Sequence, residues 1–271
     1  MKKVQRILAL AGVVLILLMY VMTMVFALRK DPAARGLFFG SLAMTVFVPI
    51  FLYAMQLAAR MVRPGKSPVI DAVIFDLGRV LVDFPWHDHA ESLGLSPEGL
   101  AFVENRIYES EYWHCLDRGT MTQEEVIRAF AEEAPELTDD IRRYIETIYH
   151  CLVPYSYTES WLAALQARGY RTYVLTNWPV GAAEEMRERG TLSFEKYVDG
   201  AVWSCEEHLL KPDPAIFQLL LSRYGLTASR CVFIDDREEN VEAARAEGFA
   251  AFRFENYPDA VRRLASLGVK V

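Results

Sequence analysis

The sequence predicts an α/β protein in which a doubly wound parallel sheet carries a helical cap inserted after its first strand, preceded by two transmembrane helices. Three observations lead to this prediction. Beyond residue 68, short apolar runs alternate with helical patterns, as expected when helices cover both faces of a parallel sheet. Residues 85–154 interrupt the alternation with helical patterns alone. Near the N-terminus, two long stretches contain no charged residue.

The two uncharged stretches, residues 7–28 and 36–59, predict a transmembrane hairpin over residues 1–62. As a helix, the first stretch would rise about 33 Å, enough to cross a hydrocarbon core of about 30 Å. A cleaved signal peptide has a shorter apolar region, and a helix buried in a soluble core normally has a polar stripe. Gly36 and Gly40 have the spacing that lets membrane helices approach closely, so an oligomer formed through the hairpin remains an open alternative.

The charge of the chain is unevenly distributed. Residues 1–66 contain nine basic residues and one acidic residue, whereas the other 205 residues contain 20 basic and 35 acidic residues, a net charge of −15. An acidic body of this kind disfavours nucleic-acid binding. Six of the basic residues flank the outer ends of the hairpin and three lie in its turn, which favours an arrangement with both ends inside.

The expected location is therefore the cell (inner) membrane, as a multi-pass protein in contact with the lipid bilayer and with its body in the cytoplasm. Residues 63–68 form a linker between the hairpin and the body. In a reducing cytoplasm, cysteines remain free thiols and need no disulfide partners. The chain has four: Cys115, Cys151, Cys205 and Cys231.

Five apolar runs after the linker predict the strands of the sheet. They are rich in Val, Ile, Phe and Tyr and mostly lack polar alternation, as expected for strands buried on both faces. They cover residues 69–75, 171–175, 198–203, 231–234 and 250–254.

Helical patterns separate these strands, and a glycine follows four of the helices, where a left-handed residue is favoured. These helices are expected at residues 158–168, 180–189, 214–224 and 238–247, with a closing amphipathic helix at 257–267. The α/β core therefore comprises residues 69–84 and 155–271. Residues 85–154 form the cap, without a strand, and its helices are expected at residues 97–112, 122–133 and 138–151.

Polar residues follow the carboxyl ends of the predicted strands, where doubly wound sheets place their sites. Acidic residues gathered at one sheet edge repel one another unless a cation lies among them, and Mg²⁺ suits oxygen ligands together with a substrate phosphate. A nucleophilic carboxylate, a hydroxyl donor and a lysine cover what phosphoryl transfer requires. The strand-end residues are Asp76, Thr176, Asn177, Lys211, Asp235 and Asp236.

In this order the strand-end residues resemble the four motifs of the haloacid dehalogenase (HAD) superfamily of hydrolases, which have a Rossmann-like core. The match covers about residues 69–255. The sequence Phe-Asp-Leu-Gly-x-Val-Leu-Val-Asp, which begins at Phe75, is similar to the first motif of one branch of the superfamily, as are Thr-Asn and Lys-Pro-Asp-Pro further along the chain to its later motifs. That branch contains the bacterial alpha-glucose-1-phosphate phosphatase and the N-terminal phosphatase domain of soluble epoxide hydrolases.

The resemblance implies a role for each strand-end residue. Asp76 would be the nucleophile that forms an aspartyl-phosphate. Mg²⁺ would be bound by Asp76, the main-chain carbonyl of Gly78 and Asp236, with Asp235 assisting. Phosphoryl oxygens would be held by Thr176 and Lys211, with Asn177 as a further donor. Asn240 would orient Lys211 or a metal-bound water.

Gly78 departs from the pattern of the superfamily. Most phosphatases of the superfamily have a second aspartate two residues after the nucleophile, which acts as general acid and base. Its loss removes a contribution usually worth about 10²–10⁴-fold in rate. An anomeric phosphate needs the acid less, which agrees weakly with a sugar 1-phosphate substrate. Asp83 is a candidate substitute, although a structural role where the first strand meets the cap is the more ordinary interpretation.

Other residues have two interpretations each. Residues 86–89, Trp-His-Asp-His, are either metal ligands or surface residues at the entrance to the cap, and the second is the more ordinary. Cys205 follows the third strand but has no evident activating histidine. Aromatic residues of the cap either line a substrate pocket or form the cap core: Tyr108, Tyr112 and Trp113, with His114 beside them.

The predicted function is a membrane-anchored, Mg²⁺-dependent phosphatase that acts on a small phosphate ester, with a sugar phosphate among the candidates. A catalytically weak membrane scaffold with the same fold is one alternative, which Gly78 alone favours. A haloacid dehalogenase is the other, although such enzymes do not need the Mg²⁺ cluster that Asp235 and Asp236 would build.

Overall fold

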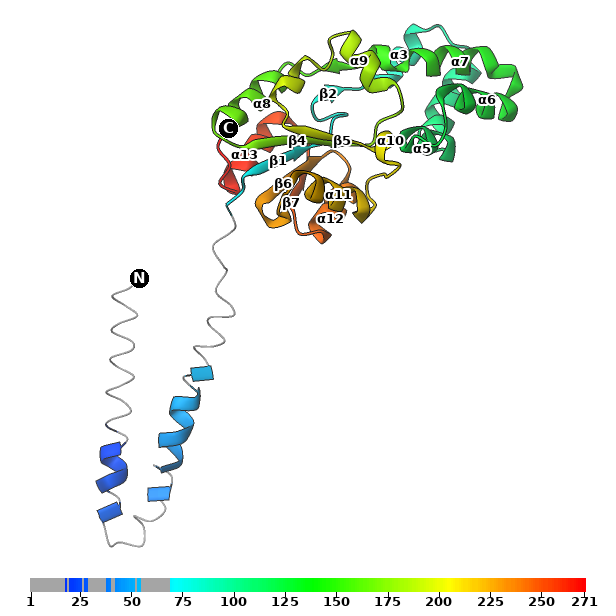
Figure 1. The fold of residues 1–271 in the computed structure, drawn as a ribbon. Helices are drawn as coiled ribbons and strands as arrows, with labels where there is room; N and C mark the ends of the chain where they lie inside the picture. Colours follow the sequence, from blue (N-terminus) through cyan, green and yellow to red (C-terminus); the bar gives the residue numbers. More distant parts are fainter. Residues whose placement is uncertain are drawn as a thin grey trace. The chain divides into compact units, whose positions relative to one another are not determined.

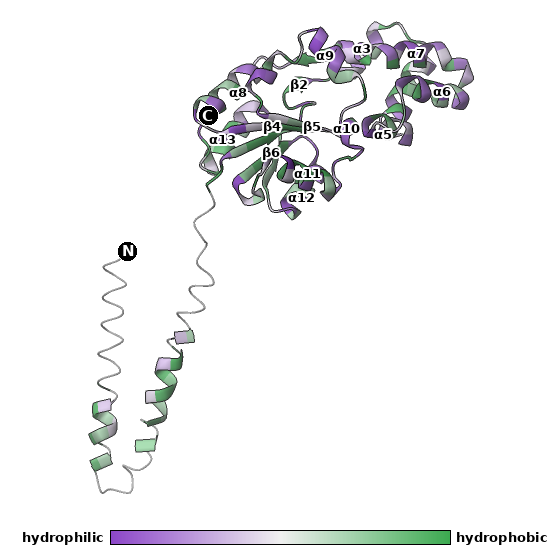
Figure 2. Cartoon of the chain, viewed as in Figure 1, coloured by the Kyte–Doolittle hydropathy of each residue, from purple (hydrophilic) through white to green (hydrophobic). Residues whose placement is uncertain are grey.

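The computed structural model of the protein describes residues 18, 20–25, 27–28, 38–39, 42–51, 53–54 and 69–271. The chain divides into two compact units, Met1–Ser67 and Pro68–Val271. In the first unit the described residues are helical and mostly apolar (Figures 1 and 2). Within the described residues, no helix combines the length and the apolar character that crossing a bilayer requires. The predicted hairpin lies partly, and the linker and the Gly36–Gly40 pair wholly, outside the described residues.

The second unit contains a five-stranded sheet in the order β5-β4-β1-β6-β7, with every neighbouring pair parallel (Figure 1). Each predicted strand is present. Because β1 lies at the centre, the residue that follows it is flanked by the ends of β4 and β6. The strands are β1 (Ala72–Phe75), β4 (Arg171–Thr176), β5 (Gly200–Trp203), β6 (Cys231–Asp235) and β7 (Ala250–Arg253).

Helices cover both faces of the sheet, because alternate residues of β1 enter two separate hydrophobic clusters. Val73 and Phe75 pack with the cluster that includes α8, α9 and α13, whereas Ala72 and Ile74 pack with the cluster that includes α11 and α12. The predicted doubly wound arrangement is thereby confirmed. The core helices are α8 (Thr158–Ala167), α9 (Ala182–Glu188), α10 (Ser204–Glu207), α11 (Pro214–Tyr224), α12 (Glu238–Ala246) and α13 (Tyr257–Ser266).

The cap is helical, as predicted, but its first long helix is not continuous. A π-helical segment, Val103–Ile107, follows α4, and a new helix begins after Ser110, whose side chain accepts the Trp113 N–H. The prediction of one helix over residues 97–112 is therefore wrong, because Ser110 caps a separate helix. The cap helices are α3 (Trp86–Ser92), α4 (Pro97–Phe102), α5 (Glu111–Arg118), α6 (Gln123–Glu133) and α7 (Thr138–Thr147).

A short antiparallel ladder closes the base of the cap, where β2 (Val82–Asp83) pairs with β3 (Val153–Pro154). The expectation that residues 85–154 contain no strand is wrong at β3, because two residues are too few to show a periodic pattern. Asp83 accepts hydrogen bonds from the Phe84 N–H at 2.9 Å and from the Tyr155 hydroxyl at 3.1 Å. Asp83 thus joins the chain segments that enter and leave the cap.

Candidate active site

A cavity of about 810 Å³ lies between the carboxyl ends of the strands and the cap. Five residues predicted from strand ends line it together with Gly78, although they come from separate parts of the sequence. These residues are Asp76, Gly78, Thr176, Asn177, Lys211 and Asp236. A smaller cavity of about 360 Å³ beside β5 is lined by other residues.

Lys211 lies at the centre of the buried charges. Its ammonium donates to a carboxylate oxygen of Asp76 at 2.7 Å and to one of Asp235 at 2.6 Å. Burial alone would lower the pKa of Lys211, but Asp235 and Asp76 outweigh it, so that the pKa is raised. Lys211 therefore stays positively charged within reach of Asp76, as expected of a residue that offsets phosphoryl charge.

Asp235 is fully buried at the end of β6, and its carboxylate is held from several sides. Besides Lys211, it accepts from the main-chain N–H of Arg237 at 2.9 Å and from the Asn240 carboxamide at 3.0 and 3.1 Å. The structure thus refines the expectation for Asn240. Among the described residues, its side chain bonds to Asp235 and reaches Lys211 only through that carboxylate.

Three carboxylates form a compact group that fits a hard cation. One oxygen from each of Asp76, Asp235 and Asp236 lies within 4.8 Å of the others. Burial, together with Asp235 and Asp236, raises the pKa of Asp76 although Lys211 opposes the rise. Burial and Asp235 likewise raise the pKa of Asp236. Such mutual repulsion is relieved by a divalent cation, and carboxylate oxygens are ligands that Mg²⁺ prefers.

Thr176 ends β4 with its hydroxyl free to bind a ligand. The side chain is 1% exposed, and its Oγ1 has no hydrogen-bond partner among the described residues. A buried hydroxyl without a partner is costly unless a ligand or water completes it. Because Thr176 lines the same cavity as Asp76, this atom is available to a phosphoryl oxygen.

Asn177 joins two of the predicted motifs. Its carboxamide oxygen accepts the Lys211 N–H at 2.8 Å, and its Nδ2 donates to the Lys211 carbonyl at 2.9 Å. This reciprocal pair fixes the main chain of Lys211 beside the end of β4. One N–H of the Asn177 carboxamide remains for a ligand.

Gly78 lines the cavity and lies beside the Trp178 ring. A Cβ atom added at Gly78 would meet the Trp178 ring at 3.6 Å, an ordinary contact distance. The main chain of Trp178 is fixed because its N–H donates to Ser204 Oγ at 2.8 Å. A Cβ atom alone is therefore tolerated at this position.

The cap supplies an aromatic wall. Trp86, Tyr108, Trp113 and His114 line the cavity, whereas Tyr112 packs against Phe130, with ring centroids 5.2 Å apart. Within the cap, the Tyr108 ring contacts Trp86 and Trp113, and its hydroxyl is bonded to that of Tyr144. Tyr108, Trp113 and His114 therefore line the predicted pocket, whereas Tyr112 belongs to the core of the cap.

Several charged residues of the cavity wall were not predicted, and three of them lie close to the carboxylate group or on the cap: Arg79, Asp117 and Arg237. Arg79 has φ of 57°, and its guanidinium lies 3.8 Å from Asp236. Asp117 belongs to no strand-end motif, because it comes from the last turn of α5. Its spacing from Trp113, four residues along a helix, places both on one face, which was the available signal.

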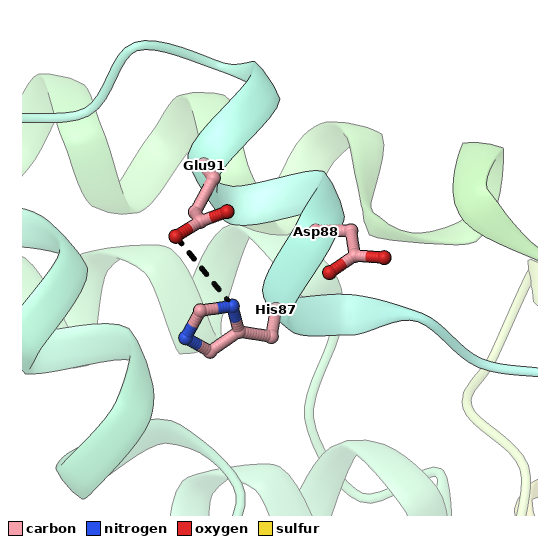
Figure 3. A group of neighbouring side chains, drawn as sticks. All are labelled: His87, Asp88 and Glu91. Carbon is pink, nitrogen blue, oxygen red and sulfur yellow. Dashed lines mark ion pairs between the residues drawn. The ribbon is translucent and has the colours of Figure 1, made fainter.

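His87, Asp88 and Glu91 form a second acidic group, at the start of the cap (Figure 3). All three are exposed, and His87 contacts Glu104 at 2.8 Å and Glu91 at 3.9 Å. These ion pairs account for the grouping without a metal. Burial raises the pKa of the Cys205 thiol to about 11, as expected of an unreactive cysteine.

Residues 70–248 match the sequence profile described as haloacid dehalogenase-like hydrolase. The chain is 29% identical over 178 residues to a sesquiterpene phosphatase of Aspergillus oryzae, a match covering 65% of this chain and 86% of the relative. It is 27% identical over 218 residues to flavin mononucleotide hydrolase 1 of Arabidopsis thaliana, covering 77% of this chain and 81% of the relative.

Two solved structures illustrate the likeness of the fold. A HAD family enzyme from Bacteroides thetaiotaomicron, in complex with magnesium and inorganic phosphate, has a TM-score of 0.57 and 19% identity, covering 70% of this chain and 98% of that one. The L-2-haloacid dehalogenase from Xanthobacter autotrophicus, with chloropropionic acid covalently bound, has a TM-score of 0.53 and 18% identity, covering 75% and 85%.

Proposed function

Because the chain belongs to the haloacid dehalogenase-like hydrolases, we propose that it is a phosphatase that hydrolyses the monoester of a small phosphorylated metabolite, with a sugar phosphate among the candidates. The observation that carries the proposal is the group of three carboxylates, Asp76, Asp235 and Asp236, within 4.8 Å of one another. Phosphoryl transfer needs a cation at this place, whereas attack on a carbon–halogen bond does not. Among the relatives, one is named a sesquiterpene phosphatase and another a flavin mononucleotide hydrolase, which supports the proposal.

In the proposed reaction, a carboxylate oxygen of Asp76 attacks the phosphorus atom while the bond from phosphorus to the ester oxygen breaks. An aspartyl-phosphate forms on Asp76, and water then attacks its phosphorus to release phosphate and restore the carboxylate. Thr176 donates its hydroxyl hydrogen to a phosphoryl oxygen, and the Lys211 ammonium offsets phosphoryl charge. The contact of 2.7 Å between Lys211 and Asp76 and the unpartnered Thr176 hydroxyl support these roles. Asn177 offers its remaining N–H to the phosphoryl group.

Asp76, Asp236 and the main-chain carbonyl of Gly78 would hold Mg²⁺, with Asp235 assisting. The bound cation would neutralise charge on the phosphoryl group. In this assignment the hydrogen bonds from Asn240 and the Arg237 N–H orient Asp235, which in turn positions Lys211.

The decisive test is Asp76→Asn, measured as phosphate release from a panel of phosphorylated metabolites with Mg²⁺ or with a chelator. The substitution should abolish release, and the chelator should do the same to the parent. Without metal, the melting temperature should stay equal or rise, because the substitution relieves repulsion with Asp235 and Asp236. The matched control is Asp88→Asn, an exposed carboxylate of the cap. Wild-type turnover by Asp76→Asn would show that the nucleophile is a different residue.

The same assay separates the two alternatives, of which the glycine at residue 78 favours the scaffold. Chloride release from 2-chloropropionate without Mg²⁺ would favour a dehalogenase. Tight binding of phosphorylated ligands with no release of phosphate or chloride would favour a scaffold.

The proposal also places residues 1–62 in the cell membrane as a hairpin that anchors the catalytic unit in the cytoplasm. The uncharged stretches in the sequence support it, as do the exposed apolar side chains among the described helical residues. Met24 is 67% exposed and Phe47 is 70% exposed. Apolar surface of this kind marks contact with a membrane or another protein. A lipid bilayer is the partner that the length of the stretches favours.

A further inference from the structure

We propose that Asp117, on the cap helix α5, is the general acid and base that replaces the aspartate absent at residue 78. The inference rests on the proposed phosphatase function and adds a catalytic residue to it. Three observations carry it: the position of Asp117 in the cavity, the anchoring of its main chain to the core, and its surroundings of charge.

Asp117 lines the cavity that also contains Asp76, Gly78 and Thr176. Asp76 directly follows β1, whereas Asp117 lies in the last turn of α5, a helix of the cap. A phosphate ester bound at Asp76 directs its leaving group away from the nucleophile, because attacking and leaving oxygens are roughly in line. The cap side of the cavity is therefore where a proton donor to the leaving oxygen is needed.

The main chain of Asp117 is fixed to the catalytic core. The buried Ser204 hydroxyl donates to the Asp117 carbonyl at 2.6 Å and accepts the Trp178 N–H at 2.8 Å. One side chain thus connects α5 to the loop that follows Thr176. In the next residues, the Arg118 carbonyl lies 2.9 Å from Nδ1 of His208. These bonds hold the main chain of Asp117 against the core.

The protonation of Asp117 suits an acid that acts near neutral pH. Burial, followed in smaller part by Asp76, raises the pKa of Asp117 to about 7, although Arg237 and Lys211 oppose the rise. The carboxyl group is therefore partly protonated at neutral pH, as general acid catalysis favours. The titratable or charged groups around it are Asp76, Lys211 and Arg237 in the core, Tyr149 and Cys205 where the cap meets the core, and His114 and Arg118 on α5 itself.

Other carboxylates near the site are less suited to this role. Asp83 bonds to Phe84 and Tyr155 and does not line the described cavity. Glu104 is paired with His87 at 2.8 Å, and Glu239 with Arg237 at 2.6 Å. Glu109 is exposed at the rim.

The proton balance of the two half-reactions follows directly. As Asp76 attacks phosphorus, the Asp117 carboxyl gives its proton to the departing ester oxygen, which leaves as the alcohol. The Asp117 carboxylate then takes a proton from the water that attacks the aspartyl-phosphate, so that phosphate is released and both residues return to their initial state. The sum is one ester and one water converted to one alcohol and one phosphate.

The test is Asp117→Asn, which keeps the size of the side chain and removes its proton exchange. With an alkyl phosphate that the parent cleaves, kcat should fall by about 10²-fold or more. With p-nitrophenyl phosphate, whose leaving group needs no acid, the first burst of nitrophenolate should stay within about tenfold while later turnovers slow, because the second half-reaction loses its base. Phosphorylated enzyme should accumulate.

Three further variants complete the design, with melting curves to confirm folding. Asp83→Asn is the matched control and should keep the ratio of rates on the two esters unchanged. Asp117→Glu should restore part of the alkyl phosphatase activity, and so should Gly78→Asp combined with Asp117→Asn. Equal losses in the first turnover on both esters, an unchanged kcat in Asp117→Asn on the alkyl phosphate, or an ester-dependent loss in Asp83→Asn would overturn the assignment of Asp117. Absence of phosphate release from the parent would overturn the proposed function itself.

Discussion

Lys211 is the residue on which the charge balance of the site depends. It is 4% exposed and contacts two carboxylates at 2.6 and 2.7 Å. Removing one partner of a buried ion pair leaves an uncompensated charge, which typically costs about 3–5 kcal/mol. At this site the ammonium serves two carboxylates, so its loss affects both stability and chemistry.

We therefore expect Lys211→Met to abolish measurable phosphate release and to lower the free energy of unfolding of the metal-free protein at pH 8 by about 3–5 kcal/mol. Denaturant unfolding at this pH is the measurement. Lys196→Met is the control, because Lys196 pairs with Glu159 at an exposed site and such pairs contribute about 1 kcal/mol or less. Equal effects of the two substitutions would contradict the central role of Lys211.

Asp117 provides a prediction on pH that does not depend on activity. Its pKa of about 7 in the folded protein exceeds the ordinary value of 3.8. The folded state therefore holds this proton more tightly than the unfolded state, so stability falls as pH rises from about 4 to 7. The free energy of unfolding of Asp117→Asn, minus that of the parent, should therefore be larger at pH 8 than at pH 5, by at least about 1 kcal/mol. A difference in unfolding free energy between variant and parent that is the same at both pH values would contradict the raised pKa of Asp117.

The strand-end residues could be predicted from the sequence, because each follows an apolar run that is recognisable by itself. Asp76 and Thr176 are of this kind, and the parallel sheet brings them together. Asp117 could not be predicted, since its function depends on how the cap docks on the core. The hydrogen bonds of Ser204 that fix it join residues far apart in the chain.

At the scale of elements, the same contrast holds between long and short segments. The five core strands follow from buried apolar runs, and α6 from the capping box of Thr122 with Glu125. The ladder of β2 with β3 and the π-helical segment Val103–Ile107 are set by tertiary contacts instead. Segments of two to five residues carry too little periodicity for a pattern to indicate them.

The junction between α5 and α10 determines how the cap meets the core. Gly119 ends α5 with φ of 73°, and a Cβ atom there would lie 2.2 Å from the main-chain oxygen of Cys205. Any side chain at Gly119 must move α5 away from the core. Because Asp117 lies two residues earlier, such a movement also displaces its carboxyl group.

Gly119→Ala should therefore lower the free energy of unfolding by more than the roughly 1 kcal/mol that a left-handed residue alone costs. It should also reduce activity on alkyl phosphates more than on p-nitrophenyl phosphate. The control is Gly94→Ala, also in the cap, with φ of +63° and no atom within 4 Å of the added Cβ. Thermal melting and the two-ester assay measure both effects. Equal losses for the two glycines would mean that the junction tolerates movement.

At the scale of the whole molecule, the chain divides into two units, and the candidate site belongs to the second. Every residue of the candidate site lies within Pro68–Val271, which is compact by itself. Residues 1–66 contain nine basic residues and one acidic residue, whereas the rest of the chain is acidic. Basic residues of this kind attract anionic lipid headgroups, which supports the proposed membrane anchor.

The last prediction concerns the anchor. Removing residues 1–67 should move the protein from the membrane fraction to the soluble fraction while kcat on phosphate esters stays within about twofold, since the described residues that line the cavity all belong to the second unit. The milder control replaces two exposed apolar residues, Leu18 and Phe47, by alanine. This variant should stay in the membrane, because each long apolar stretch then carries one change only. In the full chain, an alkaline phosphatase fused after Val271 should be inactive, since six basic residues at the outer ends favour the inside. An active fusion would contradict the predicted orientation. A full chain found in the soluble fraction would contradict the proposed membrane anchor.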